Sequence, residues 1–186
     1  MDQTNYFVVL TGGPGVGKTT LLKELHKRGF SMVEEDARRI IREQLEADTD
    51  GLPWKNKLHY SRLMLAASSV SYLTQRKKNT KDYVFFDRGI PDTLAYIAME
   101  NLAFEDEILQ EAKKLRYHNK VFILPPWKAI YENDNERKQT WAEAKYTFKV
   151  MRDTYQKLGY ETIIVPQTTV GERATFILQT LDQQSY

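Results

Sequence analysis

Short apolar runs alternate along the chain with longer segments whose apolar residues keep a helical spacing. The runs are rich in valine, isoleucine and phenylalanine, which is typical of strands buried on both faces. They predict strands at residues 7–10, 30–33, 83–86, 121–124 and 162–165. The segments between them predict a helix that ends at residue 28, a helix that begins near 91, and helices at about 36–47, 56–76, 105–115, 141–158 and 170–181.

Strands that alternate with helices are joined by right-handed crossovers and form a parallel sheet covered on both faces. We therefore predict an α/β fold of three layers, α/β/α, around a five-stranded parallel sheet. The 186 residues contain no internal repeat or interdomain linker, so we expect one domain over residues 1–186. Ligands of such sheets bind at the carboxyl ends of the strands, and the residues there are the candidates for function.

The helix before the fifth strand has the most regular pattern. Its apolar residues form one stripe that we expect to face the core: Trp141, Ala144, Phe148, Met151, Tyr155 and Leu158. The helix at about 56–76 is also amphipathic, with apolar residues Leu63, Leu65, Ala66, Val70 and Leu73. A basic residue closely followed by glycine, at Gly29 and Gly159, marks two helix ends.

The segment after the first strand fits the pattern G-x-x-x-x-G-K-[S/T] at every fixed position. Its glycines let the backbone turn tightly and point N–H groups inward, where the following helix N-terminus adds partial positive charge. Lys18 can then reach the β- and γ-phosphates of a nucleotide triphosphate, and the Thr19 hydroxyl can bind Mg²⁺. The predicted nucleotide-binding residues are Gly12, Gly13, Pro14, Gly15, Val16, Gly17, Lys18, Thr19 and Thr20.

An acidic residue ends the third apolar strand, in the sequence Asp87-Arg88-Gly89. Such an aspartate is placed to hold Mg²⁺, directly or through water. Arg88 can bind an anionic substrate or neutralise charge in the transition state. The alternative is that Asp87 caps the helix that begins near Pro91.

The second strand is followed by Glu34-Glu35-Asp36-Ala37-Arg38-Arg39. We assign Glu35 to the acceptor hydroxyl, as a general base, and Arg38 to substrate binding, because both follow a strand end. The alternative interpretation is purely structural: Asp36 is a helix N-cap, and the arginines lie on a solvent-exposed helix face. For Asp36 and Arg39 we favour that interpretation.

The fourth strand is followed by two prolines, Trp127 and a polar, charged stretch. This pattern predicts a mobile lid at about 126–145, from which Arg137 contacts the transferring phosphoryl group. The alternative is a solvated helix N-terminus, and the sequence favours neither.

Composition narrows the functions further. Lysine and arginine together number 27 and aspartate and glutamate 25, which gives no signal for nucleic acid as a partner. The absence of cysteine excludes disulfides and thiolate metal sites and is compatible with a reducing compartment. The first residues are polar, and no apolar run approaches the roughly 18 residues of a membrane span. We expect a cytoplasmic protein without such a span.

The chain resembles the NadR-like P-loop ATPase/kinase family, in particular its branch of small stand-alone predicted ATPases. The resemblance covers nearly the whole chain and rests on TGGPGVGKTT, VEEDARRIIREQ, FFDRGIPDTLAY, RYHNKVFILPPW, IYENDNERKQTWAEA and LGYETIIVP. It implies a kinase-like strand order 2-3-1-4-5, a lid after the fourth strand and Mg-nucleotide binding. It places the following residues at matching motif positions: Glu35, Arg38, Asp87, Arg88 and Arg137.

These features predict an ATP-dependent kinase for a small, nucleoside- or nucleotide-like metabolite, or an ATPase, with Mg²⁺ as cofactor. The alternative is a nucleotide-dependent switch with a protein or lipid partner. A G-protein form of this switch is disfavoured because the chain has no N-K-x-D segment to recognise guanine. We expect ATP rather than GTP as the nucleotide, although the sequence does not decide between them. A ring-forming motor is disfavoured because Arg88, instead of a glutamate, follows Asp87. The sequence names neither the acceptor nor an oligomeric state.

Overall fold

The computed structural model describes residues 3–103, 106–128 and 139–183. At its centre lies a five-stranded parallel sheet of order β2-β3-β1-β4-β5. The strands are β1 (Phe7–Thr11), β2 (Ser31–Val33), β3 (Val84–Asp87), β4 (Lys120–Ile123) and β5 (Glu161–Ile164). The parallel direction and the order 2-3-1-4-5 are those predicted.

The helices of the described residues also lie close to their predicted places. They are α1 (Lys18–Lys27), α2 (Ala37–Glu46), α3 (Lys57–Lys77), α4 (Ile90–Met99), α5 (Asp106–Lys114), α7 (Trp141–Lys157) and α8 (Val170–Asp182). A short 3₁₀ turn, η1 (Gln3–Tyr6), precedes β1 and was not predicted. Within the described part of the chain, no helix is both long and apolar enough to cross a bilayer.

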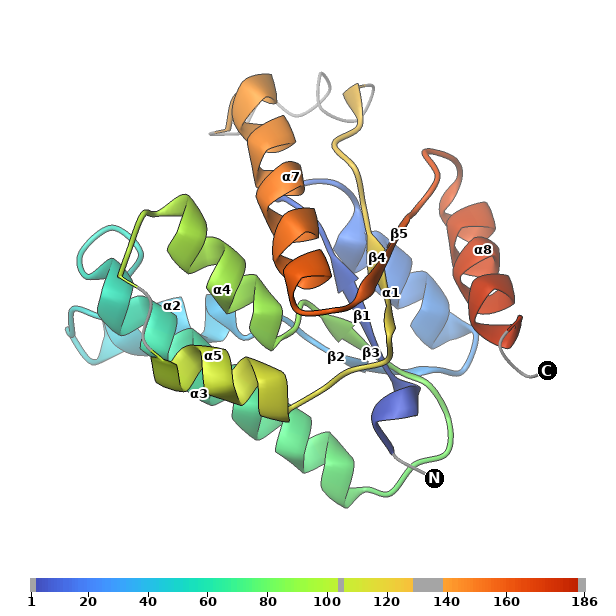
Figure 1. Ribbon diagram of the computed structural model, residues 1–186, viewed down its shortest axis with the longest axis horizontal. Helices are drawn as coiled ribbons and strands as arrows, with labels where there is room; N and C mark the ends of the chain where they lie inside the picture. The colour runs from blue at the N-terminus through green and yellow to red at the C-terminus, as the bar shows by residue number, and fades with distance from the viewer. Residues whose placement is uncertain (1–2, 104–105, 129–138, 184–186) are drawn as a thin grey trace.

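Successive side chains of β1 point to two different layers of helices. Phe7 and Val9 pack with residues of α3, α4, α5 and α7, whereas Val8 and Leu10 pack with residues of α1 and α8. Figure 1 shows α1 and α8 on one side of the sheet and α3, α4 and α5 on the other. The sheet is therefore the middle of three layers, as the alternation of strands and helices predicted.

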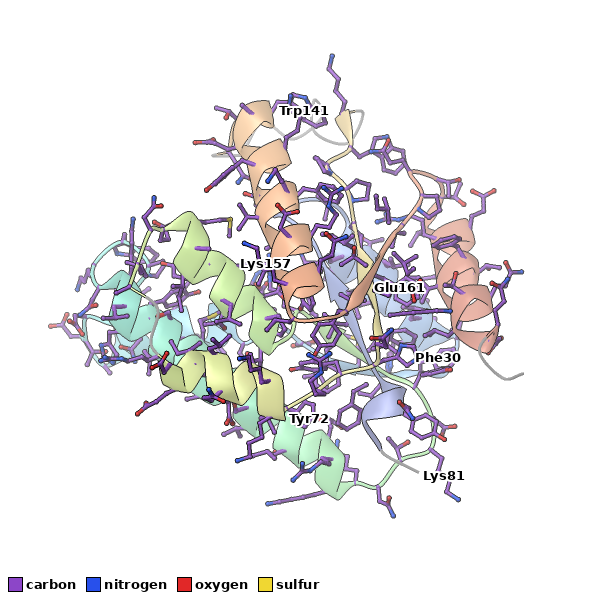
Figure 2. All side chains as sticks on the ribbon, in the orientation of Figure 1. Phe30, Tyr72, Lys81, Trp141, Lys157 and Glu161 are labelled. Carbon is purple, nitrogen blue, oxygen red and sulfur yellow. The ribbon has the colours of Figure 1, made fainter. Side chains whose placement is uncertain are left out.

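The helix α7 packs against α4 and beside β4 and β5. Figure 2 labels its first and last residues, Trp141 and Lys157. Burial of Ala144, Met151 and Tyr155 confirms the predicted apolar stripe. Because this stripe faces the carboxyl ends of the strands as well as the core, α7 forms one wall of the site described below.

The two predicted glycine helix ends are confirmed. Gly29 has φ +97° and Gly159 has φ +82°, in the left-handed region that side chains with a Cβ rarely adopt. Each glycine follows the end of a helix and lies two positions before the first residue of a strand.

The buried face of α3 agrees with the prediction in part, because Leu63, Leu65 and Leu73 pack against the core. Val70 is 64% exposed, whereas Tyr60, Met64 and Tyr72 are buried. Tyr72 can enter the core because its hydroxyl donates to the carbonyl of Arg116 at 2.6 Å. The prediction was wrong for Val70 and incomplete for the rest of the face, because it considered aliphatic positions and left out tyrosine, whose ring is apolar and whose hydroxyl needs only one partner.

Candidate functional site

The glycine loop lies between the carboxyl ends of β1 and β4. Gly12 has φ +142°, and a Cβ at this position would lie 2.7 Å from the carbonyl oxygen of Leu124. Only glycine therefore allows the chain to leave β1 so close to the end of β4. Pro14 and Gly15 at the tip of the loop are exposed, as are Thr19 and Thr20 at the start of α1.

Lys18 lies folded back over this loop. Its Nζ donates to the carbonyl oxygens of Gly12 and Gly13, each at 2.9 Å, and the residue is 7% exposed. Burial, and then the positive charge of Arg88, lower the pKa of Lys18 to about 8, although nearby carboxylates oppose this shift. The loop thus holds a desolvated cation that a bound anion would stabilise.

Asp87 ends β3 beside Leu10 of β1. Its Oδ1 atom is buried and has no hydrogen-bond partner among the described residues. Burial raises the pKa of Asp87 above its ordinary value. Asp87 does not cap α4, because the capping carboxylate is Asp92, which accepts from the Gly89 N–H at 2.8 Å. The capping alternative for Asp87 was therefore wrong, and its carboxylate is left available for a ligand.

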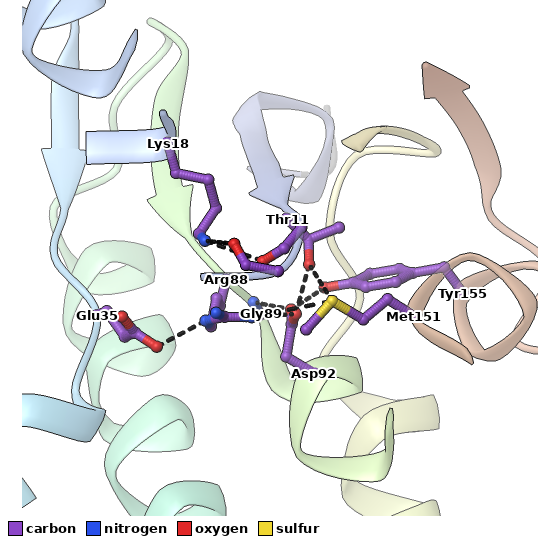
Figure 3. A network of polar contacts seen from close by, with 10 residues as sticks. Thr11, Lys18, Glu35, Arg88, Gly89, Asp92, Met151 and Tyr155 are labelled. Carbon is purple, nitrogen blue, oxygen red and sulfur yellow. Dashed lines mark hydrogen bonds and ion pairs between the residues drawn. The ribbon is translucent and has the colours of Figure 1, made fainter. Parts of the chain in front are cut away.

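Arg88 connects the neighbouring strand ends, as Figure 3 shows. Its Nε donates to Glu35 Oε1 at 2.6 Å, and its Nη1 lies 3.4 Å from Asp92 Oδ1. The backbone of Arg88 is left-handed, with φ +70°, a conformation that costs energy in any residue with a Cβ. Burial lowers the pKa of Arg88, but Glu35, Asp92 and Asp87 raise it further, and the net shift is upward. Arg88 is therefore a permanent cation in a strained, fixed position.

Asp92, at the start of α4, holds Arg88 and the end of β1 in place. No role was predicted for this residue from the sequence. Its carboxylate accepts hydrogen bonds from Thr11 Oγ1, from Gly89 N and, at 2.5 Å, from the Tyr155 hydroxyl. The side chain of Asp92 is only 2% exposed. One local signal was present, since an acid three residues after Gly89 at a helix start is the position of a capping carboxylate. The hydrogen bonds of Asp92 to Thr11 of β1 and Tyr155 of α7 could not be predicted from the local sequence.

The residues after β2 divide into two groups. Glu35 points to Arg88, whereas Arg38 is exposed on α2 and is not brought to the other predicted residues. Asp36 occupies the N-cap position of α2, but its side chain makes no capping bond. It accepts instead from Arg39 at 2.8 Å and from Ser71 Oγ at 3.0 Å, so its predicted capping role was wrong. Arg39 lies on a solvated face, as expected.

A groove of about 600 Å³ opens between α7 and the helices α2, α3 and α4. Tyr60, Met64, Tyr96, Met99 and Met151 supply its apolar and aromatic lining, and Glu35, Arg88, Asp92, Glu100, Gln139 and Glu143 its polar lining. Burial, and then the charge of Glu35, raise the pKa of Tyr60 to about 12. The size and the lining are those of a small-molecule site, and Pro14 of the glycine loop lines one end.

The predicted lid at about 126–145 is described only at its two ends. Arg137 lies outside the described residues, and its predicted contact with the phosphoryl group stays a prediction. The second end is the start of α7, where Gln139 and Glu143 line the groove. Gln139 Nε2 donates to Thr147 Oγ1 at 2.8 Å, which holds this side chain on α7.

The strand order and the glycine loop define a P-loop protein with a kinase-type fold. The family model described as an AAA domain, AAA_28, matches residues 7–173, and the chain belongs to this family. A search of curated proteins found no significant sequence match.

Solved structures with the same fold include several kinases. The match to deoxyadenosine kinase from M. mycoides has a TM-score of 0.62 at 17% sequence identity. It covers 95% of this chain and 99% of the kinase chain. Thymidylate kinase from Ehrlichia chaffeensis has a TM-score of 0.62 at 19% identity, with coverages of 93% and 98%. The NadR protein in complex with NR has a TM-score of 0.70 at 18% identity over 97% of this chain and 50% of NadR. The predicted NadR-like P-loop relationship is confirmed.

Proposed function

We propose that the protein is an ATP- and Mg²⁺-dependent phosphotransferase whose acceptor is the hydroxyl group of a nucleoside-like small molecule. The observation that carries the proposal is the position of Glu35 and Arg88. Both line the groove, and their charges also act on Lys18 of the glycine loop. A phosphoryl donor in the loop and an acceptor in the groove would meet at this pair.

The loop residues fit a Mg-nucleotide. Lys18 is desolvated and held by carbonyl oxygens that a phosphate can replace. The described residues contain no group of three or more His, Cys, Asp or Glu that could hold a metal alone. Mg²⁺ in proteins is bound by one or two protein ligands together with phosphate oxygens and water, and the Thr19 hydroxyl and Asp87 are the ligands for such a site. When bound, the ion neutralises charge on the transferring phosphates.

The charges of the groove favour a neutral or cationic acceptor. Four carboxylates line it, from Glu35, Asp92, Glu100 and Glu143, and Arg88 is the one cation in the described part of its lining. Arg88 is already paired with two of these carboxylates. A phosphorylated acceptor would bring a further anion without a free partner. A nucleoside therefore fits better than a nucleotide.

The apolar lining indicates a planar ring. Tyr60 and Tyr96 lie edge to face with centroids 5.5 Å apart, and methionine side chains surround them. The Tyr96 hydroxyl is buried and bonds to none of the described residues, which leaves a donor for a polar atom of the acceptor. The structurally similar deoxyadenosine kinase is by its name an enzyme for a nucleoside.

Glu35 is the group that we assign to the acceptor proton. Its Oε1 is held by Arg88, and its Oε2 accepts no hydrogen bond within the described residues. Arg88 thus orients the carboxylate and leaves one oxygen for the acceptor hydroxyl. A hydroxyl placed there would be activated by Glu35 as general base and attack the γ-phosphate in line.

The proposal is tested with matched pairs of acceptors. Each nucleoside is compared with its own monophosphate in a thermal-shift assay with Mg²⁺ and a non-hydrolysable ATP analogue, and active compounds are then followed for transfer of labelled phosphate from ATP. We expect nucleosides to raise Tm by mass action and monophosphates to raise it less. ATP hydrolysis without transfer to any acceptor would contradict the proposal and favour the alternative, a nucleotide-dependent switch.

A further inference from the structure

Arg173 of α8 lies directly beneath the glycine loop. Its Nη2 donates to the carbonyl oxygen of Val16 at 3.2 Å, and the residue is 5% exposed. Its Nη1 lies 3.0 Å from the position that a Cβ of Gly17 would occupy. The guanidinium therefore touches the two residues that precede Lys18, from a helix near the other end of the chain.

The charge of Arg173 is not balanced by any described residue. Its Nε is buried without a hydrogen-bond partner, and no described carboxylate forms an ion pair with it. Burial lowers its pKa below the ordinary value. Arg88 differs in both respects, since Glu35 and Asp92 compensate its charge. A buried cation without a counter-ion destabilises a folded protein, so an anion supplied from outside is the expected compensation.

We propose that Arg173 is a positioning residue for the phosphate chain, whose positive charge is compensated only when phosphates occupy the adjacent glycine loop. Its hydrogen bond to Val16 directs that carbonyl away from the phosphate site and so supports the inward direction of the loop N–H groups. Its charge adds to the field of Lys18 and of the α1 N-terminus. The inference rests on the proposed binding of nucleotide phosphates but is independent of the acceptor.

Two substitutions separate the charge from the hydrogen bond. Arg173→Gln keeps a donor for the Val16 carbonyl and removes the charge, whereas Arg173→Lys keeps the charge. We expect Arg173→Gln to weaken binding of both Mg-ATP and Mg-tripolyphosphate by about tenfold or more, and Arg173→Lys by less. In the absence of ligand, neither variant should be less stable than the wild type. Arg173→Gln removes a buried charge that has no counter-ion, and Arg173→Lys retains that charge.

The matched control is Arg28→Gln. Arg28 also joins α1 to α8, through the Gly171 carbonyl at 2.8 Å and Thr175 Oγ1 at 2.9 Å, but it is not in contact with the loop. Its substitution should leave both affinities unchanged.

The measurements are isothermal titration and thermal unfolding of the full chain. Wild-type affinity in Arg173→Gln, equal losses in the Gln and Lys variants, or an equal loss in Arg28→Gln would each overturn the inference. If Arg173→Gln does not fold, the test rests on Arg173→Lys. A loss of phosphate affinity in Arg173→Lys as large as that in Lys18→Met would then overturn the inference. A wild-type protein that binds neither Mg-ATP nor Mg-tripolyphosphate would instead defeat the proposed function.

Discussion

Arg88 Nε donates a 2.6 Å hydrogen bond to Glu35 Oε1, and this ion pair joins the carboxyl ends of β3 and β2. The two residues are 53 positions apart in the sequence. They meet because β2 and β3 are neighbours in the sheet and in parallel register, with Val33 opposite Phe86. Both side chains line the groove and act electrostatically on Lys18, so the pair lies where an acceptor and a phosphate chain would meet.

The affinity for Mg-ATP should depend on pH through Lys18. The pKa of Lys18 is about 8 in the free protein, and bound phosphates favour the charged form and raise it. Above pH 8 the complex therefore holds more protons than the free protein, and Kd should rise by up to about tenfold per pH unit. Titration calorimetry between pH of about 7 and 9.5 measures this, and Lys18→Met should bind weakly with little pH dependence. A flat wild-type profile would contradict the shifted pKa.

The same shift predicts a change in stability without ligand. The folded-state pKa of Lys18 lies below its ordinary value of 10.5. Between about pH 8 and 10.5 the unfolded chain binds more protons than the folded protein, so this group makes the free energy of unfolding rise with pH. Urea unfolding of wild type and Lys18→Met, compared across this range, isolates the contribution of Lys18.

Much of the fold could be predicted from local patterns. The inner strand β1 is buried on both faces and all five strands are marked by short apolar runs, and Gly29 and Gly159 mark where two helices end. The predicted boundaries therefore differ from the observed ones by one residue or less. The glycine loop could be recognised because all of its residues are contiguous. Parallel topology then predicts that Glu35, Asp87 and Arg88 lie at one edge of the sheet, where the Glu35–Arg88 ion pair is found.

The rest depends on contacts between distant segments. Asp92 accepts from Tyr155, 63 residues away, and Arg173 donates to Val16, 157 residues away. No local spacing predicts either pair, because each is decided by how helices pack on the sheet. The predicted face of α3 was incomplete for a related reason, since the burial of Tyr72 depends on its bond to Arg116 in another segment.

Asp92 should contribute strongly to stability and to the position of Arg88. Its carboxylate accepts from Thr11, Gly89 and Tyr155, and Asp92→Asn replaces one acceptor oxygen with a donor that opposes them. We expect a loss of about 2–4 kcal/mol in the free energy of unfolding, measured in urea. Tyr155→Phe removes one of these hydrogen bonds and should cost about 1 kcal/mol. Equal effects of the two variants would show that Asp92 does not organise the network.

Asp87 should couple nucleotide binding to Mg²⁺. In wild type we expect Mg²⁺ to tighten ATP binding, and in Asp87→Asn we expect the affinity ratio with and without Mg²⁺ to fall by about tenfold or more. The variant should also be more stable without ligand, since burial raises the pKa of Asp87 and disfavours its charged form. The control is Asp82→Asn, an exposed residue before the other end of β3. Calorimetry with Mg²⁺ or with a chelator gives the ratio, and an unchanged ratio in Asp87→Asn would remove this residue from the metal site.

Glu35 distinguishes a phosphotransferase from a switch. Glu35→Gln retains the size of the side chain and an oxygen for Arg88 but cannot accept a proton from an acceptor hydroxyl. Phosphoryl transfer should therefore fall by about 10²–10⁴-fold while the affinity for Mg-ATP changes little. Glu34→Gln is the matched control, because Glu34 is the exposed neighbour and should keep wild-type activity.

The two rates that decide the role of Glu35 are transfer to the acceptor and background hydrolysis of ATP. A general base for the acceptor affects the first and leaves the second nearly unchanged, because water does not need the position of the acceptor hydroxyl. A residue that only fixes Arg88 through their 2.6 Å contact would lower both rates together, since Arg88 also faces the phosphate loop. Wild-type transfer in Glu35→Gln would exclude both roles and make Asp36 the next candidate for the acceptor proton.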